Sequence, residues 1–325
     1  MSNQRTFYVA PYGQDSNGGT SPAHPWRTVA RVDRALLQPG DRVLFAGGAT
    51  FSDATLMPGE GFSASGTGAA PIVFGSYGSR MARLTRGVWL GTNSLYPRGP
   101  SHLTFQDLVL GPAQGFQGTG DYIKLINLRI SHLLGPGSDQ ETGIATEGSH
   151  WVIDGNTISD TGDSGMLLGF GADSPGDPPG GEDYVINNNT VSHTGLDGRL
   201  SYPLHAIYLK VADARVSGNR LTYFHDDGVS LRYRDETVSG NYIAHGRIGI
   251  AWYQYDQHPG VTRVIGNTIA FTSSAAIFVC GAAESCIRPI ESFIVEHNQL
   301  HKTKGDALNL QPTAGKYVIE ENTRH

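Results

Sequence analysis

A short phrase of alternating apolar and polar residues recurs along the second half of the chain, each time with an Asn near its end. Its copies are VIDGNTI, VINNNTV, RVSGNRL, TVSGNYI, RVIGNTI, FIVEHNQL and YVIEENT, with Asn156, Asn189, Asn219, Asn241, Asn267, Asn298 and Asn322. Successive Asn residues are 22 to 33 positions apart. LTFQDLVL (103–110) and IKLINLRI (123–130) fit the same apolar frame without the Asn. A period of about 22 residues with longer insertions is typical of a solenoid.

A second β-favouring phrase follows six of these copies or their equivalents. It reads GMLLGF (165–170), AIYLKV (206–211), GVSLRY (228–233), GIAWYQ (249–254), AIFVCG (276–281) and ALNLQP (307–312). No helical period lies between the phrases, so each coil should contain two or three short strands. This pattern predicts an all-β fold, a single-stranded right-handed parallel β-helix. The repeated Asn should stack at a bend, with the adjacent Gly in a tight corner.

The N-terminal region differs from the repeats. TFYVAP (6–11) is expected to be a strand, and residues 25–38 to form a short helix that begins at Pro25 and places Val29, Val32 and Leu36 on one face. A solenoid end exposes its core, so we expect this helix to cap it. We expect one domain over 1–325, with strand and cap in 1–45 and coils in 46–325.

Composition and charge exclude several classes of protein. The 325 residues include 43 Gly, only 17% are charged, and the net charge is −6. These values argue against a disordered chain and against a general basic surface for nucleic acid. No apolar run is long enough for a membrane span, and no signal peptide is present. We expect a secreted or periplasmic monomer whose signal peptide has been removed, and Cys280 and Cys286 are either a disulfide or two buried thiols.

The alternation of the second phrase separates inward from outward positions. Its second and fourth positions are apolar in every copy and should face the core, so the third and fifth should face outward. On three successive coils the outward positions, continued to the seventh, supply Tyr208, Lys210, Arg232, Arg234, Tyr253 and Tyr255. Coils stack about 4.8 Å apart. Lys210 and Arg232 should therefore be neighbours without a carboxylate in their column, which favours an anionic ligand.

A second group of polar residues precedes these strands, and we place all of it at a corner of the coil. It comprises Asp163, His205, His225, Asp226, Asp227, His245 and Arg247. Such residues often only form turns, but an Asp pair also serves as the acid and base of a hydrolase or as calcium ligands. Asp163, Asp226 and Asp227 are the candidate metal ligands, with either no cofactor or Ca²⁺ expected. The insertions at 171–183 and 195–203 should wall a cleft that Arg199 and Tyr202 reach.

The two-coil stretch HAIYLKVADARVSGNRLTYFHDDGVSLRYRDETVSGNYI (205–243) resembles the β-helix polysaccharide lyases of the chondroitinase B and alginate lyase type. In that family one strand ends in a catalytic Lys and the strand one coil later carries a catalytic Arg, which match Lys210 and Arg232. The segment YVAPYGQDSNGGTSPAHPWRTV is similar to the start of secreted β-helix proteins that act on carbohydrates. The family's acidic calcium ligand is replaced here by His205 or Ala206, and its next His by Tyr233. Other β-helix lyases use Lys with Tyr and no metal, a pattern that Tyr208 or Tyr253 fits.

The resemblance implies β-elimination at a 4-linked uronate of an anionic polysaccharide. Arg232, Arg234 or Arg247 would hold the carboxylate, because neutralising it makes the C5 proton more acidic. Lys210 would remove that proton, and Tyr253 or Tyr208 would protonate the leaving oxygen. The remaining candidates are His205 and His225 as reserve bases, and Tyr233, Tyr255, Arg199 and Tyr202 as further substrate contacts.

Three alternatives remain open from the residues alone. Asp226-Asp227 followed by His245-Gly246 is similar to β-helix polygalacturonases, which are glycoside hydrolases. A uronate C5-epimerase would use the same proton abstraction without elimination. A non-catalytic glycan-binding or tail-spike-like β-helix would use the same outer face for binding alone.

Overall fold

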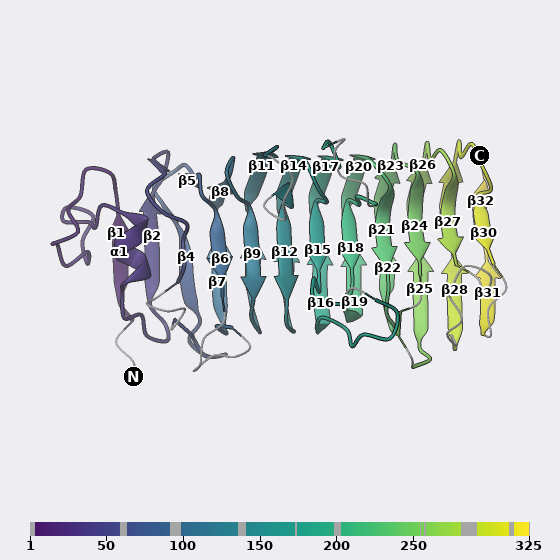
Figure 1. The fold of residues 1–325 in the computed structure, drawn as a ribbon, viewed down its shortest axis with the longest axis horizontal. Helices are drawn as coiled ribbons and strands as arrows, with labels where there is room; N and C mark the ends of the chain where they lie inside the picture. Colours follow the sequence, from purple (N-terminus) through teal and green to yellow (C-terminus); the bar gives the residue numbers. More distant parts are fainter. Residues whose placement is uncertain are drawn as a thin grey trace.

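The chain forms an elongated solenoid of three long parallel sheets (Figure 1). A computed structural model describes residues 4–58, 64–91, 99–135, 141–172, 174–197, 203–253, 255–256, 258–280, 291–311 and 315–324. Each coil adds one strand to each sheet, and neighbouring strands pair in parallel, as β18 with β21 and β21 with β24. The predicted parallel β-helix is confirmed.

Within the described residues, the first sheet has 12 strands and the second has 11. The first contains β1 (Thr6–Val9), β2 (Arg42–Ala46), β4 (Ile72–Tyr77), β7 (Leu103–Gln106), β10 (Lys124–Ile126), β13 (Val152–Asp154), β16 (Glu182–Asn187), β19 (Ala212–Ser217), β22 (Thr237–Ser239), β25 (Val261–Ile265), β28 (Ser292–Glu296) and β31 (Lys316–Glu320). The second contains β3 (Thr50–Phe51), β5 (Ala82–Leu84), β8 (Leu108–Leu110), β11 (Arg129–Leu133), β14 (Thr157–Thr161), β17 (Thr190–Thr194), β20 (Arg220–Phe224), β23 (Tyr242–Ala244), β26 (Thr268–Ala270), β29 (Gln299–His301) and β32 (Thr323–Arg324).

The third sheet carries the candidate site, and nine of its strands lie in the described part of the chain. They are β6 (Val88–Leu90), β9 (Phe116–Thr119), β12 (Ile144–Glu147), β15 (Met166–Leu168), β18 (Ile207–Leu209), β21 (Asp227–Leu231), β24 (Ile248–Trp252), β27 (Ala275–Val279) and β30 (Leu308–Leu310). The inward positions predicted from the second phrase are buried from Met166 to Val279 and half-buried at Leu308 and Leu310 in the C-terminal coil.

The repeated Asn forms the predicted ladder between the first and second sheets. The Nδ2 of Asn189 donates to Oδ1 of Asn219 at 2.9 Å, and Nδ2 of Asn219 donates to Oδ1 of Asn241 at 2.9 Å. Each Asn also satisfies backbone groups; Asn219 Nδ2 donates to the Ile186 carbonyl at 2.9 Å. The preceding residue has a left-handed backbone, as in Gly218 with φ 63°, which explains why Gly recurs there.

The N-terminal helix is shorter than predicted. α1 spans Val29–Asp33, and the Thr28 side chain caps it by accepting from the Arg31 N–H. Val29 and Val32 are buried in the same apolar cluster as the coils. Leu36 is 75% exposed, so its predicted place on the buried face is wrong. The helix ends before Leu36, and the chain there no longer follows a helical period.

Among the described residues, no helix is both long and apolar enough to cross a bilayer.

Candidate functional site

The outward positions of β18, β21 and β24 form one continuous patch on the third sheet. Tyr208 pairs with Ser230 in register, and Ser230 pairs with Ala251. The intervening Leu209 and Leu231 are buried in the core, so alternation turns Lys210 and Arg232 to the outer face. The predicted juxtaposition is confirmed, although both cations are only 6% exposed rather than solvated.

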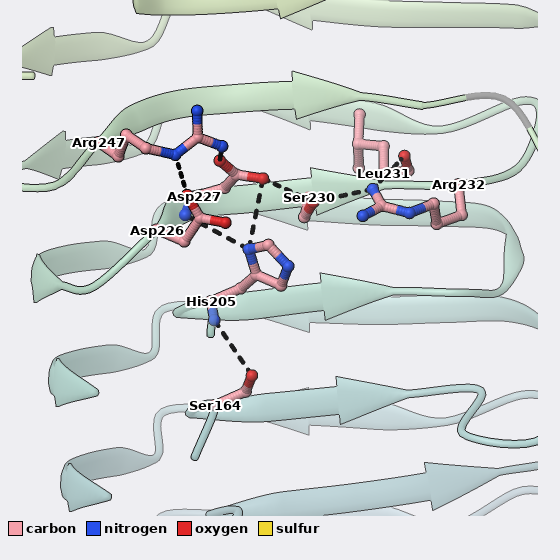
Figure 2. Close-up of polar contacts among 8 residues, drawn as sticks. All are labelled: Ser164, His205, Asp226, Asp227, Ser230, Leu231, Arg232 and Arg247. Atoms are coloured by element: carbon pink, nitrogen blue, oxygen red, sulfur yellow. Dashed lines mark hydrogen bonds and ion pairs between the residues drawn. The ribbon is translucent and has the colours of Figure 1, made fainter. Parts of the chain in front are cut away.

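Three tyrosine rings surround the Arg232 guanidinium. Its Cζ lies 4.6 Å from the centroid of Tyr208, 4.3 Å from that of Tyr253 and 5.4 Å from that of Tyr255. Nη1 donates to Ser230 Oγ at 2.8 Å and to the Leu231 carbonyl at 3.0 Å (Figure 2). Nε is buried and has no hydrogen-bond partner among the described residues. The rings stabilise the cation without neutralising its charge.

The Tyr208 ring lies close to both cations of the patch. The Lys210 ammonium lies 4.9 Å from the centroid of the Tyr208 ring. Burial raises the pKa of Tyr208 to about 12, against the opposing effect of the Arg232 charge. Burial also raises the pKa of Tyr253. Both phenols therefore stay protonated at neutral pH and can act as proton donors.

Asp226 lies in the bend between β20 and β21, at the predicted corner, whereas Asp227 is the first residue of the strand. β21 begins at Asp227, and Asp227 Oδ2 accepts from Ser230 Oγ at 2.9 Å. Arg247 contacts both carboxylates, with Nε on Asp226 Oδ1 and Nη2 3.2 Å from Asp227 Oδ1 (Figure 2). Burial raises the pKa of Asp227 to about 7, the Asp226 charge adds to this, and Arg247 opposes it. One carboxyl of the pair therefore retains a proton near neutral pH more readily than an ordinary Asp.

His205 is a buried neutral imidazole beside this pair. The Asp227 N–H donates to its Nδ1 at 3.3 Å, and that nitrogen lies 3.3 Å from Asp227 Oδ2. Burial lowers the pKa of His205 well below its usual value, and Arg232 and Arg247 lower it further. Its Nε2 has no hydrogen-bond partner in the described structure. The ring also packs edge-on against Tyr208 at 4.7 Å between centroids.

One group of potential metal ligands occurs here. His205, Asp226 and Asp227 each offer an atom within 4.8 Å of the others. One imidazole nitrogen with two carboxylates suits a divalent cation, but Arg247 already pairs with both carboxylates. Asp163, the third predicted ligand, is outside this group and accepts from the Ser164 N–H. Calcium binding thus stays a prediction that requires Arg247 to move.

Several other candidates have structural partners instead of facing a ligand. Tyr233 was predicted to contact substrate, which is wrong because it is fully buried and its hydroxyl donates to the Asp177 carbonyl at 3.1 Å. It anchors the 171–183 insertion to the coil. Arg234 is paired with Asp256. His245 stacks between Tyr223 and Phe271, at 4.6 and 4.8 Å, in a ladder on the second sheet and does not contact the Asp pair.

Of the remaining candidates, some lie in the described part of the chain and the others do not. His225 is exposed next to the Asp pair, and Tyr255 is half-buried against Tyr233, with ring centroids 6.3 Å apart. Arg199 and Tyr202 lie outside the described residues, as does Cys286.

A groove of about 640 Å³ begins at Lys210 and follows the outer face of the third sheet toward the N-terminus. Its floor includes Leu167, Ala145, Gln117 and Trp89, and Phe170 and Gly171 line it as the 171–183 insertion begins. Of the two insertions expected to wall a cleft, only the first residue of 171–183 is among the described residues that line this groove. Our sequence reasoning assigned no role to Trp89, Gln117 or Ser230. Ser230 occupies one of the predicted outward positions. Extending the alignment of outward positions to β6 and β9 would have identified Trp89 and Gln117.

Residues 115–324, more than half of the chain, match the family described as right-handed beta helix region. Over 80 residues, 24% of this chain, it is 36% identical to the lacto-N-biosidase of Bifidobacterium longum subsp. longum, but that stretch is only 5% of the relative's length.

Solved structures of two activities share the fold. The GH136 lacto-N-biosidase from Eubacterium ramulus superimposes with a TM-score of 0.62 at 16% identity, over 99% of this chain and 68% of that one. Pectate lyase Pel9A superimposes with a TM-score of 0.57 at 15% identity, over 99% and 79%. At these identities the likeness establishes the fold, which carbohydrate-active lyases and hydrolases both use. The three-sheet architecture and the family match together show that this chain belongs to the right-handed β-helix family.

Proposed function

We propose that the protein is a polysaccharide lyase that cleaves an anionic, uronate-containing polysaccharide by β-elimination. The observation that carries the proposal is that the Tyr208 ring lies close to both cations, with the charged groups of Lys210 and Arg232 at 4.9 and 4.6 Å from its centroid. A base, a proton donor and a fixed positive charge thus lie together, and Lys210 opens into the groove. These are the groups that elimination requires.

The reaction assigns one step to each group. Arg232 attracts the uronate carboxylate and offsets the negative charge that develops when C5 loses its proton. The Lys210 amine takes that proton, and the electron pair forms the double bond between C4 and C5. The C4–O bond breaks, and the Tyr208 hydroxyl gives its proton to the leaving oxygen. Exchange with water then returns Lys210 and Tyr208 to their starting states.

Arg232 is favoured over the other two arginines because of its partners. Arg234 is paired with Asp256, and Arg247 with Asp226 and Asp227. Within the described residues, no carboxylate lies within ion-pair distance of Arg232. Its charge is therefore the one of the three that remains available to attract an anion.

Glycoside hydrolysis at Asp226 and Asp227 is the second candidate. The raised pKa of Asp227, to about 7, would suit a general acid beside a second carboxyl, that of Asp226. The 80-residue similarity to lacto-N-biosidase also favours it. It ranks second because both carboxylates are almost fully buried and paired with Arg247.

A substrate panel separates the two chemistries. Wild-type protein is incubated with alginate, pectate, glycosaminoglycans and glucuronan, with and without chelator. Ultraviolet absorbance then reports 4,5-unsaturated uronate, and a reducing-end assay reports every cleavage. We expect both signals to rise in parallel on at least one polymer. Reducing ends without absorbance would establish the hydrolase, and C5 inversion without cleavage would establish an epimerase.

A further inference from the structure

The groove beyond Lys210 differs in charge from the patch where it begins. Among the described residues that line it, Lys210 is the sole charged side chain; the others include Leu167, Ala145, Gln117 and Trp89. The Glu147 carboxylate is close to the lining residue Gly171, because a Cβ at Gly171 would lie 2.6 Å from Glu147 Oε1. From the described residues that line the groove, a second uronate placed beyond Lys210 would gain no cation, and it would come near the Glu147 carboxylate at Gly171.

The floor of the groove is a single column of the third sheet. Trp89 pairs with Gln117, Gln117 with Ala145, Ala145 with Leu167, and Leu167 with Tyr208. At about 4.8 Å per strand, the four steps from Tyr208 to Trp89 cover roughly 19 Å, enough for several sugar units. The floor between them is apolar or neutral, and Trp89 is 45% exposed at its far end.

Trp89 and Gln117 supply what a neutral sugar needs. The exposed indole of Trp89 offers a flat apolar surface on which a sugar ring can stack, and the Gln117 amide, whose Oε1 accepts from Gln114 Nε2 at 3.3 Å, is an uncharged polar group beside it. Pockets that combine aromatic surface with a few polar groups are typical small-molecule and sugar sites. Neither side chain favours a carboxylate over a hydroxyl or acetamido group.

We infer that the substrate is a mixed polysaccharide, in which the uronate at Lys210 is followed along the groove by neutral sugars, the outermost of which stacks on Trp89. The inference rests on the proposed function for the identity of the sugar at Lys210. It excludes homopolymers of uronate as preferred substrates. It also makes Trp89 a specificity-determining residue for the sugars of the polysaccharide that lie beyond the cleaved bond.

The test combines cleavage with direct binding. Ultraviolet assays compare polymers in which uronate alternates with a neutral sugar with alginate and pectate. The proteins tested are wild type, Trp89→Ala, Gln117→Ala and the control Tyr12→Ala. Tyr12 is an exposed aromatic residue near the N-terminus. We expect the mixed polymers to be preferred, and Trp89→Ala to raise KM for them about tenfold with little change in kcat. Calorimetry with neutral glucose, galactose and N-acetylglucosamine oligomers should show binding to wild type and Tyr12→Ala, weakened in Trp89→Ala.

The two proposals fail in different ways. Cleavage of alginate or pectate as fast as the mixed polymers, with KM and binding unchanged in Trp89→Ala, would overturn the mixed-substrate inference. The proposal that the protein is a lyase would be unaffected. Absence of unsaturated product from every polymer, with neutral oligomers still bound through Trp89, would overturn the proposed lyase activity. The inference that the groove binds neutral sugars would be unaffected. Gln117→Ala guards against a folding defect of the Trp89 variant, because it alters the same column with a smaller change.

Discussion

The Arg232 guanidinium carbon lies 4.3 Å from the centroid of the Tyr253 ring, on the outer face of two adjacent coils. Ser230 Oγ holds one end of that guanidinium, and the same hydroxyl donates to Asp227. Through this bridge Asp227 orients Arg232 without a direct contact. The patch therefore consists of a charge held by aromatic rings and an acidic network that orients it.

The ring of Tyr253 should matter more for stability than its hydroxyl. Tyr253→Leu removes the aromatic face and should destabilise the protein by about 1–2 kcal/mol, because Arg232 stays buried. Tyr253→Phe keeps the face and should cost much less. Urea unfolding of the two variants measures the difference. Equal losses would show that the ring does not stabilise the cation.

Tyr208 should be needed for turnover rather than for folding. Tyr208→Phe keeps the ring beside Lys210 and Arg232 but removes the proton donor, so kcat should fall by about 10²-fold or more. Tyr253→Phe is the matched control and should lose far less. A Tyr208→Phe variant with nearly wild-type kcat would remove Tyr208 from the role of general acid.

Asp227 and Asp33 should each make the folded protein less stable as the pH rises from about 4 to 7. Burial raises the pKa of both Asp227 and Asp33 to about 7, so the folded chain holds protons that the unfolded chain releases near pH 4. Each such group contributes a slope of at most about 1.4 kcal/mol per pH unit across that window. Asp227→Asn should remove the contribution of Asp227 to this pH dependence of the free energy of unfolding and leave the contribution of Asp33. The free energy of unfolding, measured by urea titration at several pH values, gives the slope; an unchanged slope in the variant contradicts the assignment.

The Asn ladder should be the most sensitive polar feature of the coils. Asn219→Ala removes the side chain that bonds Ile186, Asn241 and Asn189, and leaves several buried groups without partners. We expect a loss of about 3 kcal/mol or more. Asn187→Ala is the control, because that half-buried side chain makes one described contact, with Ser217 at 2.5 Å. Thermal melts compare the two, and similar shifts would argue against the ladder.

The repeating features were predictable because every coil meets the same constraint. Asn219 and Gly218 occupy a corner that recurs with each turn, and strand alternation alone places Lys210 beside Arg232. Features that depend on one particular contact were not predictable. Tyr233 is buried by an insertion that folds back over it, and Arg247 reaches the Asp pair from the next coil. The interval from Val32 to Leu36 fits a helix, but the helix ends at Asp33.

The most direct test of the proposed site is the formation of unsaturated product by Lys210→Met beside Asp226→Asn, on whichever polymer the wild type cleaves. Both variants are purified at equal concentration and checked for wild-type circular dichroism before the ultraviolet assay. The account predicts that Lys210→Met forms no detectable unsaturated product, while Asp226→Asn retains a measurable fraction of wild-type activity. Full activity in Lys210→Met, or loss of all cleavage in Asp226→Asn alone, would contradict it.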